Sequence, residues 1–239
     1  MLWLLYVQVA LSALAGHKRS FRADALRTMT MLPVKVQVRG REYIPQVGPR
    51  LLTINHYFHP YVKTWWIPLG IAAQIPVEMP WVMTSYWRSP RHMRLLTRWF
   101  FPRLAAIYGF TTMPPMPPAP RETEARARSV RQALAMARKH PELVMGLSPE
   151  GGDQPSGSLI SLPEGVGRFI LLLMPHCQKI TPVGVFFEGE SLVFCFGEAY
   201  ELHAPAGLTP DERDRWAGEV VMGKIAGLLP GELRGKYEG

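Results

Sequence analysis

Two junctions between an apolar strand and a polar loop carry the residue types best suited to chemistry. Asn55 and His56 follow the apolar segment 50–54, and a Ser-Pro-Glu-Gly run at 148–151 follows the apolar segment 143–147. In open α/β sheets, ligands bind beside the carboxyl ends of the strands, so both junctions are candidate site segments. Each junction alone also fits a structural role, because a lone histidine is commonly structural and a Pro-Gly loop is commonly a turn.

The spacing of these residues argues against several familiar kinds of catalytic site. His56 and His59 are spaced like metal ligands, but no third ligand stands at a recognisable distance along the chain. The run from Gly146 to Gly151 is close to the Gly-x-Ser-x-Gly turn of serine hydrolases, yet its second glycine comes one place too late and Pro149 changes the turn. The chain has no Walker motif and no dinucleotide fingerprint. We therefore expect no bound metal and no bound cofactor.

Hydrophobic patterns predict the elements that must position these junctions. Strands are expected over 34–38, 50–54, 81–84, 143–147, 180–187 and 192–196, and helices over 61–73, 121–140, 165–174 and a final segment that Thr209 caps. On the helix over 121–140, Glu122 and Arg126 are expected to pair, as are Glu124 and Arg128. Strands alternate with helices, so the sequence predicts an α/β fold, a sheet covered by helices.

Length and cysteine content limit the class of protein. With 239 residues, of which 47% are hydrophobic and 19% charged, the chain is long and apolar enough to fold around its own core. Cys177 and Cys195 both lie in apolar runs and are too few for a disulfide framework. Two reduced, buried thiols are therefore expected, which favours a cytosolic location.

The first thirty residues predict a membrane-interfacial segment. Residues 1–15 carry no charged side chain, but as a helix they would span roughly 22 Å, short of the roughly 30 Å hydrocarbon core of a bilayer. Ala13-Leu14-Ala15 resembles a signal-cleavage site, yet the positive charges follow the apolar run instead of preceding it. We expect one helix over 1–28 lying in the membrane interface, with residues 31–239 forming the α/β domain. A cleaved signal and a short membrane span are the alternatives.

The charge balance favours an anionic partner. The chain has 27 Lys and Arg against 19 Asp and Glu, a formal net charge of +8 with neutral histidines. Nucleic acid, anionic lipid and phosphorylated substrates all attract such a protein. Seven tryptophans favour lipid, because Trp sits well at a membrane–water boundary. Residues 79–120 contain no acid but several arginines among Trp and Phe, which fits a membrane-facing surface as well as a solvated one. No named RNA-binding motif occurs, so nucleic acid is not expected as a partner.

Taken together and in order, short segments of the chain resemble the lysophosphatidic acid acyltransferase (1-acyl-glycerol-3-phosphate O-acyltransferase) superfamily. Asn55 and His56 resemble the start of its Asn-His-x4-Asp motif, and Leu147 to Gly151 resemble its Phe-Pro-Glu-Gly motif. The resemblance extends over roughly residues 34–203. Its other segments are similar to the family's opening strand and loop, Gly-rich helix start, later strand and closing turn, at 36–45, 165–171, 180–185 and 196–200.

The resemblance implies a fold and a reaction. The fold would be a mixed sheet flanked by helices, and the reaction would move an acyl chain from acyl-CoA or acyl-carrier protein, as co-substrate, to a lysolipid hydroxyl. His56 would be the general base, a role that suits an imidazole. The substrate-binding residues would be Asn55, Ser148, Pro149, Glu150, Gly151 and Arg168, with backbone N–H groups stabilising the oxyanion. The protein would work at the cytoplasmic face of the cell membrane, as a peripheral or monotopic protein.

One departure from the family pattern concerns the orientation of the histidine. The family's aspartate should stand five residues after His56, where this chain has Tyr61. The Tyr61 hydroxyl, a backbone carbonyl or the distant Glu78 would then have to orient His56. The same departure keeps a second class of function open, a catalytically weak or inactive relative that binds lipid or acyl chains. The sequence does not indicate the acyl-chain length or the oligomeric state.

A second departure concerns anion binding. The family usually continues with Thr-Arg-Ser, where this chain has Gly152-Asp153-Gln154, and Glu164 stands where a basic residue is usual before Gly165. Arg168 remains, and Arg121 or Arg103 would reach the site only through folding. The depletion of cations predicts an acceptor that is not a glycerol phosphate monoester, such as a less charged lysolipid or another alcohol or amine.

Overall fold

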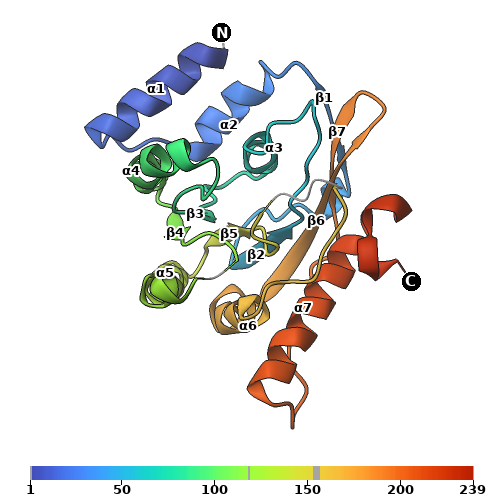
Figure 1. Ribbon diagram of the computed structural model, residues 1–239. Coiled ribbons are helices and arrows are strands. Elements are labelled where there is room, and N and C mark those ends of the chain that lie inside the picture. Colours follow the sequence, from blue (N-terminus) through green and yellow to red (C-terminus); the bar gives the residue numbers. More distant parts are fainter. Residues whose placement is uncertain (1, 118, 153–156, 239) are drawn as a thin grey trace.

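The computed structural model describes residues 2–117, 119–152 and 157–238 (Figure 1). The helices are α1 (Leu2–Ala15), α2 (Phe21–Met29), α3 (Trp66–Gln74), α4 (Arg91–Tyr108), α5 (Thr123–Lys139), α6 (Val166–Cys177) and α7 (Pro210–Ala226). The strands are β1 (Lys35–Arg39), β2 (Arg50–Ile54), β3 (Val82–Thr84), β4 (Thr111–Met113), β5 (Val144–Leu147), β6 (Lys179–Glu188) and β7 (Ser191–Phe196). Short 3-10 turns occur at Arg41–Tyr43, Pro120–Glu122, Gly231–Leu233 and Gly235–Tyr237.

The core is a mixed five-stranded sheet with helices on both faces, as predicted. Its strand order is β1-β7-β6-β2-β5, in which the β6–β7 pair is antiparallel and the other pairs are parallel. On one face α3 packs so closely that a Cβ on Gly70 would lie 2.2 Å from the ring of Phe194. On the other face, the segment after α7 lies against β6, where a Cβ on Gly184 would lie 2.9 Å from Leu228. Phe194 on β7 therefore faces the layer that contains α3, whereas Gly184 on the adjacent strand β6 faces the segment after α7.

The parallel pairing of β2 with β5 brings the two candidate junctions together. Thr53 pairs with Leu147 in this register, so both strands end at the same edge of the sheet. Parallel strands run in one direction, and their carboxyl ends therefore share an edge. The residues that follow, beginning with Asn55 and Ser148, leave the sheet side by side.

A small second sheet of β3 and β4 extends the edge beyond β5. Trp81 forms a parallel bridge with Gly146, whose N–H donates to the Pro80 carbonyl at 2.9 Å. A Cβ on Gly146 would lie 2.6 Å from the indole of Trp81, so glycine is needed for this contact. β3 matches the predicted strand, whereas β4 was not predicted.

The expected helix over 61–73 begins only at Trp66.

The expectation of one continuous helix over 1–28 is wrong. Gly16 adopts a left-handed conformation, with φ of 73°, and ends α1. Ser20 then caps α2 by accepting the Ala23 N–H at 2.9 Å. α2 packs against α3, and its Phe21 and Ala25 belong to the main hydrophobic core. Of the helices that the structure describes, none is long and apolar enough to cross a bilayer.

Both cysteines are free thiols, as the sequence predicts. Cys177 is buried and Cys195 is partly buried. Burial raises the pKa of the Cys177 thiol to about 11, and it also raises that of Cys195. Both thiols are therefore protonated, and unreactive as nucleophiles, near neutral pH.

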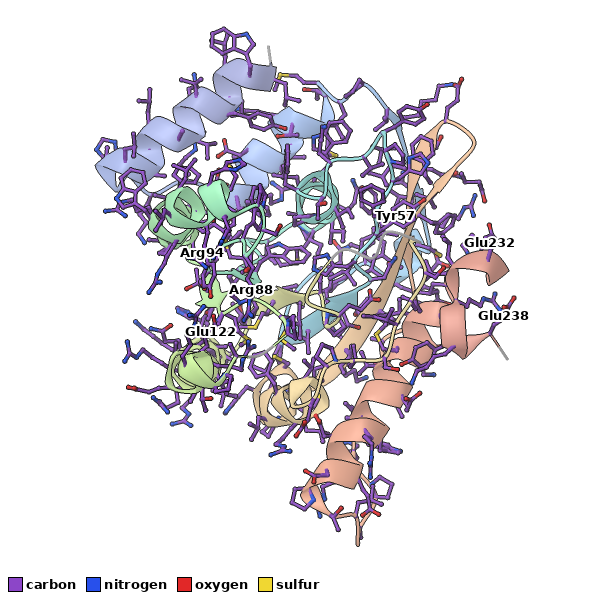
Figure 2. All side chains as sticks on the ribbon, in the orientation of Figure 1. Tyr57, Arg88, Arg94, Glu122, Glu232 and Glu238 are labelled. Atoms are coloured by element: carbon purple, nitrogen blue, oxygen red, sulfur yellow. The ribbon has the colours of Figure 1, made fainter. Side chains whose placement is uncertain are left out.

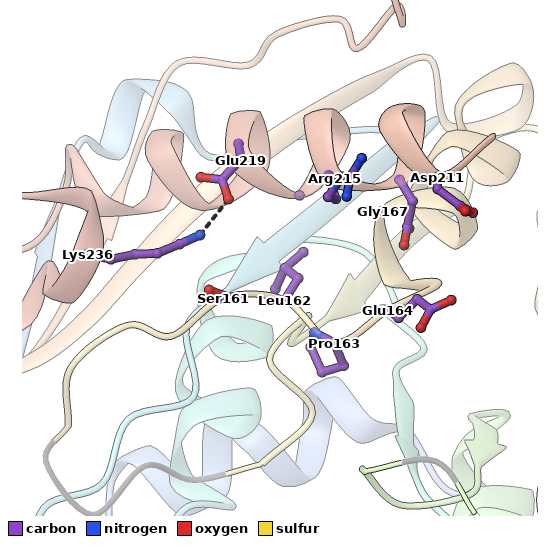
Figure 3. A pocket seen from close by; sticks show the side chains of 11 residues that line it. Ser161, Leu162, Pro163, Glu164, Gly167, Asp211, Arg215, Glu219 and Lys236 are labelled. Atoms are coloured by element: carbon purple, nitrogen blue, oxygen red, sulfur yellow. Dashed lines mark hydrogen bonds and ion pairs between the residues drawn. The ribbon is translucent and has the colours of Figure 1, made fainter. Parts of the chain in front are cut away.

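The start of α6 is held by a carboxylate from α7. Asp214 is buried, and its two oxygens accept the N–H groups of Gly165 and Arg168, each at 2.6 Å. These are backbone donors of the kind that a helix N-terminus leaves unpaired. The α7 cap itself is the expected box of Thr209 and Glu212. Beside it, a cavity of about 510 Å³ separates the segment before α6 from Asp211 and other α7 side chains (Figure 3).

Replacing Asp214 with alanine should lower the free energy of unfolding by about 2 to 3 kcal/mol, because two buried N–H groups lose their acceptor. Asp211→Ala is the matched control on the same helix, because Asp211 is exposed and its ion-pair partner among the described residues is the exposed Arg168. Its cost should stay below about 1 kcal/mol. Urea unfolding of both variants measures the difference, and equal losses would contradict the assigned role of Asp214.

Candidate active site

A buried carboxylate joins the two candidate junctions. Glu150 is 2% exposed, and its Oε2 accepts the His56 N–H at 2.7 Å. Its Oε1 accepts the Ile160 N–H at 3.1 Å. His56 and Glu150 are 94 residues apart in the sequence, so this bond fixes the histidine to the turn after β5. Hydrogen bonds from backbone N–H groups to a buried carboxylate are strong, because the acceptor is charged.

Asn55 fixes the point at which the chain leaves the sheet. Its side chain is fully buried and bridges to β6, where the Val185 N–H donates to Oδ1 at 2.7 Å. The amide Nδ2 donates in turn to the Val185 carbonyl at 2.9 Å. This pair continues the β2–β6 ladder past its last backbone partners, Ile54 and Val183. Asn55 thus positions His56 from one side and Glu150 positions it from the other.

The turn after β5 depends on a glycine. The Gly151 N–H donates to the Ser148 carbonyl at 3.2 Å, and Gly151 has a φ of 72°. A Cβ at this position would lie 2.6 Å from Cγ of Met116. Glycine is required here both for the left-handed backbone and for the close approach of Met116. Asp153 and Gln154, which also distinguish this loop from the family motif, lie outside the described residues.

The two junctions line one large apolar cavity. It has a volume of about 700 Å³, within the usual range for small-molecule sites. Predicted site residues in its lining are Asn55, His56, Ser148, Pro149 and Gly151. Apolar and aromatic side chains from α1, α2, α3 and α4 form much of the remaining wall, among them Leu5, Phe21, Leu69, Phe101 and Leu104, and Trp81 joins them from just before β3. Such a wall fits a hydrocarbon chain.

A polar cluster interrupts this apolar wall. Asp24, which is 4% exposed, receives two bonds of 2.6 Å from the Arg19 guanidinium and one of 2.8 Å from the Tyr108 hydroxyl. Burial and the bond to Asp24 raise the pKa of Tyr108, so its hydroxyl stays a donor. The hydrogen bond to Asp24 likewise raises the pKa of Arg19. Asp24 and Tyr108 line the cavity, and sequence reasoning missed both.

The proposed orienting groups lie elsewhere. Tyr61 is 71% exposed, and its ring lies 5.5 Å from that of His59, which stacks on Phe187 at 4.4 Å. Glu78 accepts hydrogen bonds from the Ser20 hydroxyl and from a backbone N–H in α2. Neither Tyr61 nor Glu78 is among the described residues that line the cavity.

The described residues include no cluster of three or more side chains suited to a metal ion.

The structure also shows where the arginines considered for anion binding lie. Arg168 pairs with Asp211 at 3.2 Å, and Arg103 stacks on Trp99; neither lines the cavity. Glu124 and Arg128 form the expected pair at 3.3 Å. The expected Glu122–Arg126 pair is wrong, because the described partners of the Glu122 carboxylate are Arg88 and the Tyr86 hydroxyl. Arg126 lines the cavity instead, which the i,i+4 pattern on the helix obscured.

Comparison with known proteins supports the fold. No protein-family model matches the chain, and no curated protein matches its sequence. Among solved structures, it is similar to the 1-acyl-sn-glycerophosphate (LPA) acyltransferase PlsC from Thermotoga maritima. The TM-score is 0.53 at 15% sequence identity, and the match covers 87% of this chain and 78% of that one. The two proteins thus share an α/β fold of a sheet flanked by helices.

Replacing Glu150 with glutamine should displace His56 and lower the free energy of unfolding by about 1 to 3 kcal/mol. Glutamine keeps one acceptor oxygen but turns an NH₂ group toward a backbone N–H that loses its partner. The ¹H–¹⁵N NMR signals of His56 and Ile160 should both shift. Glu190→Gln is the control, because its pair with Lys35 is exposed. A Glu150→Gln chain as stable as this control, with both signals unmoved, would contradict the role of Glu150.

Proposed function

We propose that this protein transfers an acyl chain from a thioester, acyl-CoA or acyl-carrier protein, to a lysolipid hydroxyl. The observation that carries the proposal is one apolar cavity of about 700 Å³ lined by both His56 and the turn after β5. The fold shared with an acyltransferase supports it. The cavity wall would hold the acyl chain, and the imidazole would meet the hydroxyl.

The reaction assigns His56 the role of general base. His56 takes the proton of the acceptor hydroxyl as its oxygen attacks the thioester carbonyl, forming a tetrahedral oxyanion. When this intermediate collapses, the carbon–sulfur bond breaks, and the leaving thiolate receives the proton from the His56 imidazolium. The products are the acylated lipid and a free thiol. Asn55 and Glu150 hold the His56 backbone in place and act as positioning residues.

His56→Ala should lower thioester-dependent acylation by about 100- to 10,000-fold, the range for losing a general base. Release of CoA from acyl-CoA, followed with a thiol reagent, measures the rate. His59→Ala is the matched control, because this ring stacks on Phe187 and does not line the cavity. Circular dichroism should show both variants folded. Equal CoA release by wild type and His56→Ala with every acceptor would refute the proposal that the protein is an acyltransferase.

A second candidate function is lipid or acyl-chain binding without turnover. The observation that favours it is Tyr61, which takes the place of the family's aspartate, is 71% exposed and is not among the described residues that line the cavity. Binding of a fluorescent fatty acid, measured together with CoA release, distinguishes the two functions. Under this second function the fatty acid would bind wild type and His56→Ala equally, and neither chain would release CoA.

We further propose that the protein works at the cytoplasmic membrane surface. α1 packs against α4, and both helices present large exposed apolar residues, chiefly Trp3, Leu11, Leu14, Leu95, Leu96 and Trp99. α4 also carries Arg91, Arg94 and Arg98. Figure 2 shows Arg94, on α4, and the nearby Arg88 far from Glu232 and Glu238 at the C-terminus. Apolar side chains beside arginines suit an anionic bilayer surface.

Changing Arg91, Arg94 and Arg98 together to glutamine should weaken binding to anionic vesicles by up to about 100-fold, because each juxtamembrane arginine contributes about 1 kcal/mol. Co-sedimentation with phosphatidylserine-containing vesicles at low and high salt measures the effect. The control removes the same charge from exposed α5 positions, in Arg128, Arg131 and Arg138. Salt-independent binding that the α4 changes leave intact would contradict this surface.

A further inference from the structure

We propose that Arg126 binds a phosphate group of a substrate held in the cavity. This inference rests on the proposed function and adds a chemical requirement to it. Of the described residues that line the cavity, Arg126 is the one lysine or arginine. It projects from α5, an element outside the motif segments that the family resemblance uses.

The protein holds the Arg126 guanidinium in place from one side. Its Nη2 donates to the carbonyls of Pro114 and Pro115, at 3.1 and 3.2 Å. These two prolines also line the cavity, as does the following Met116, which touches the glycine turn at 151. A guanidinium has five N–H donors in a planar fork, and the bonds to described residues use one of its nitrogens. The other nitrogens keep the geometry that binds a phosphate through two bonds.

The nearby charges leave this guanidinium without a carboxylate partner among the described residues. Glu122, the acid whose charge acts on Arg126, accepts bonds from Arg88 and from the Tyr86 hydroxyl. The charges of Arg88 and Arg126 thus both act on the single carboxylate of Glu122. Burial lowers the pKa of Arg126, although a guanidinium keeps its proton in this range. A partly buried cation with an unmatched charge is stabilised by an anionic ligand.

Phosphate is the anion that the proposed reaction brings to this cavity. It can come from the acceptor headgroup or from the phosphate groups of the CoA donor. The sequence alone predicts an acceptor without a phosphomonoester, because the cations of the motif segments are missing. Arg126 supplies a cation from α5, and the folded chain is therefore suited to a phosphorylated substrate.

The experiment compares two acceptors that differ only in the phosphate, lysophosphatidic acid and monoacylglycerol with the same acyl chain. Arg126→Gln should raise the KM for the phosphorylated substrate by about 10- to 100-fold, the cost of a charge-assisted bond pair. If the phosphate belongs to the acceptor, only the KM for lysophosphatidic acid rises. If it belongs to the donor, the KM for acyl-CoA rises equally with both acceptors. Either result supports a phosphate site.

Two further variants guard against a general loss of structure. Arg126→Lys keeps the charge and should recover part of the lost affinity. Arg131→Gln removes an exposed charge from the same helix and should change no KM by more than about twofold. A change below twofold in every KM of Arg126→Gln overturns the proposal. So does an equal loss with both acceptors at an unchanged KM for acyl-CoA.

A binding measurement separates this proposal from the proposed function. Tryptophan fluorescence reports on the cavity, because Trp65, Trp81 and Trp87 line it. Titration with lysophosphatidic acid, monoacylglycerol and CoA needs no turnover. A preference for a phosphorylated ligand that Arg126→Gln abolishes supports the site even in a chain without transferase activity. Transferase activity with no such preference removes this inference and leaves the proposed function standing.

Discussion

The bond between the Glu150 carboxylate and the His56 backbone is the contact on which the rest of the site depends. It is buried, charge-assisted and spans two segments that share only an edge of the sheet. Without it, the loop after β2 and the turn after β5 would lose the buried side-chain bond that joins them. Because the carboxylate also accepts the Ile160 N–H, it ties in the segment that leads toward α6. One side chain thus fixes three stretches of chain around the cavity.

Much of the fold was predictable because its signals are local. The strands β1, β2, β5, β6 and β7 are apolar or alternating runs, and the capping box at Thr209 needs only neighbouring residues. β4 was missed because its Thr-Thr-Met run is short and, unlike the apolar run at β3, shows no hydrophobic pattern. The break after Gly16 was missed because Gln8, Ser12, Arg19 and Arg22 fall at helical spacing across it, as one polar stripe. What ends α1 and starts α2 there is the left-handed Gly16 backbone and the Ser20 cap, which a helical stripe does not reveal.

The site was predictable in its position but not in its internal contacts. Parallel strands bring His56 and the turn after β5 to one edge, and this follows from the order of elements. Among the described contacts, Asn55 and Glu150 bind backbone groups of residues 10 to 130 positions away, and backbone groups carry no residue-type signal. For Glu122, the sequence predicted a partner that the structure does not show. A helical neighbour was available in Arg126, yet Arg88 and Tyr86 from another segment take the carboxylate. Tertiary partners override such weak local pairs.

The wall of the cavity has a consequence for how the protein can be shortened. Leu5, Tyr6 and Val9 of α1 line the cavity, and the Tyr6 hydroxyl accepts bonds from the indoles of Trp65 and Trp66. α2 contributes Phe21 to the same wall and to the core. An N-terminal deletion made to improve solubility would therefore remove part of the binding cavity along with the apolar surface. In this chain, the apolar N-terminal helix, which the sequence places at a membrane interface, forms part of the wall of the cavity.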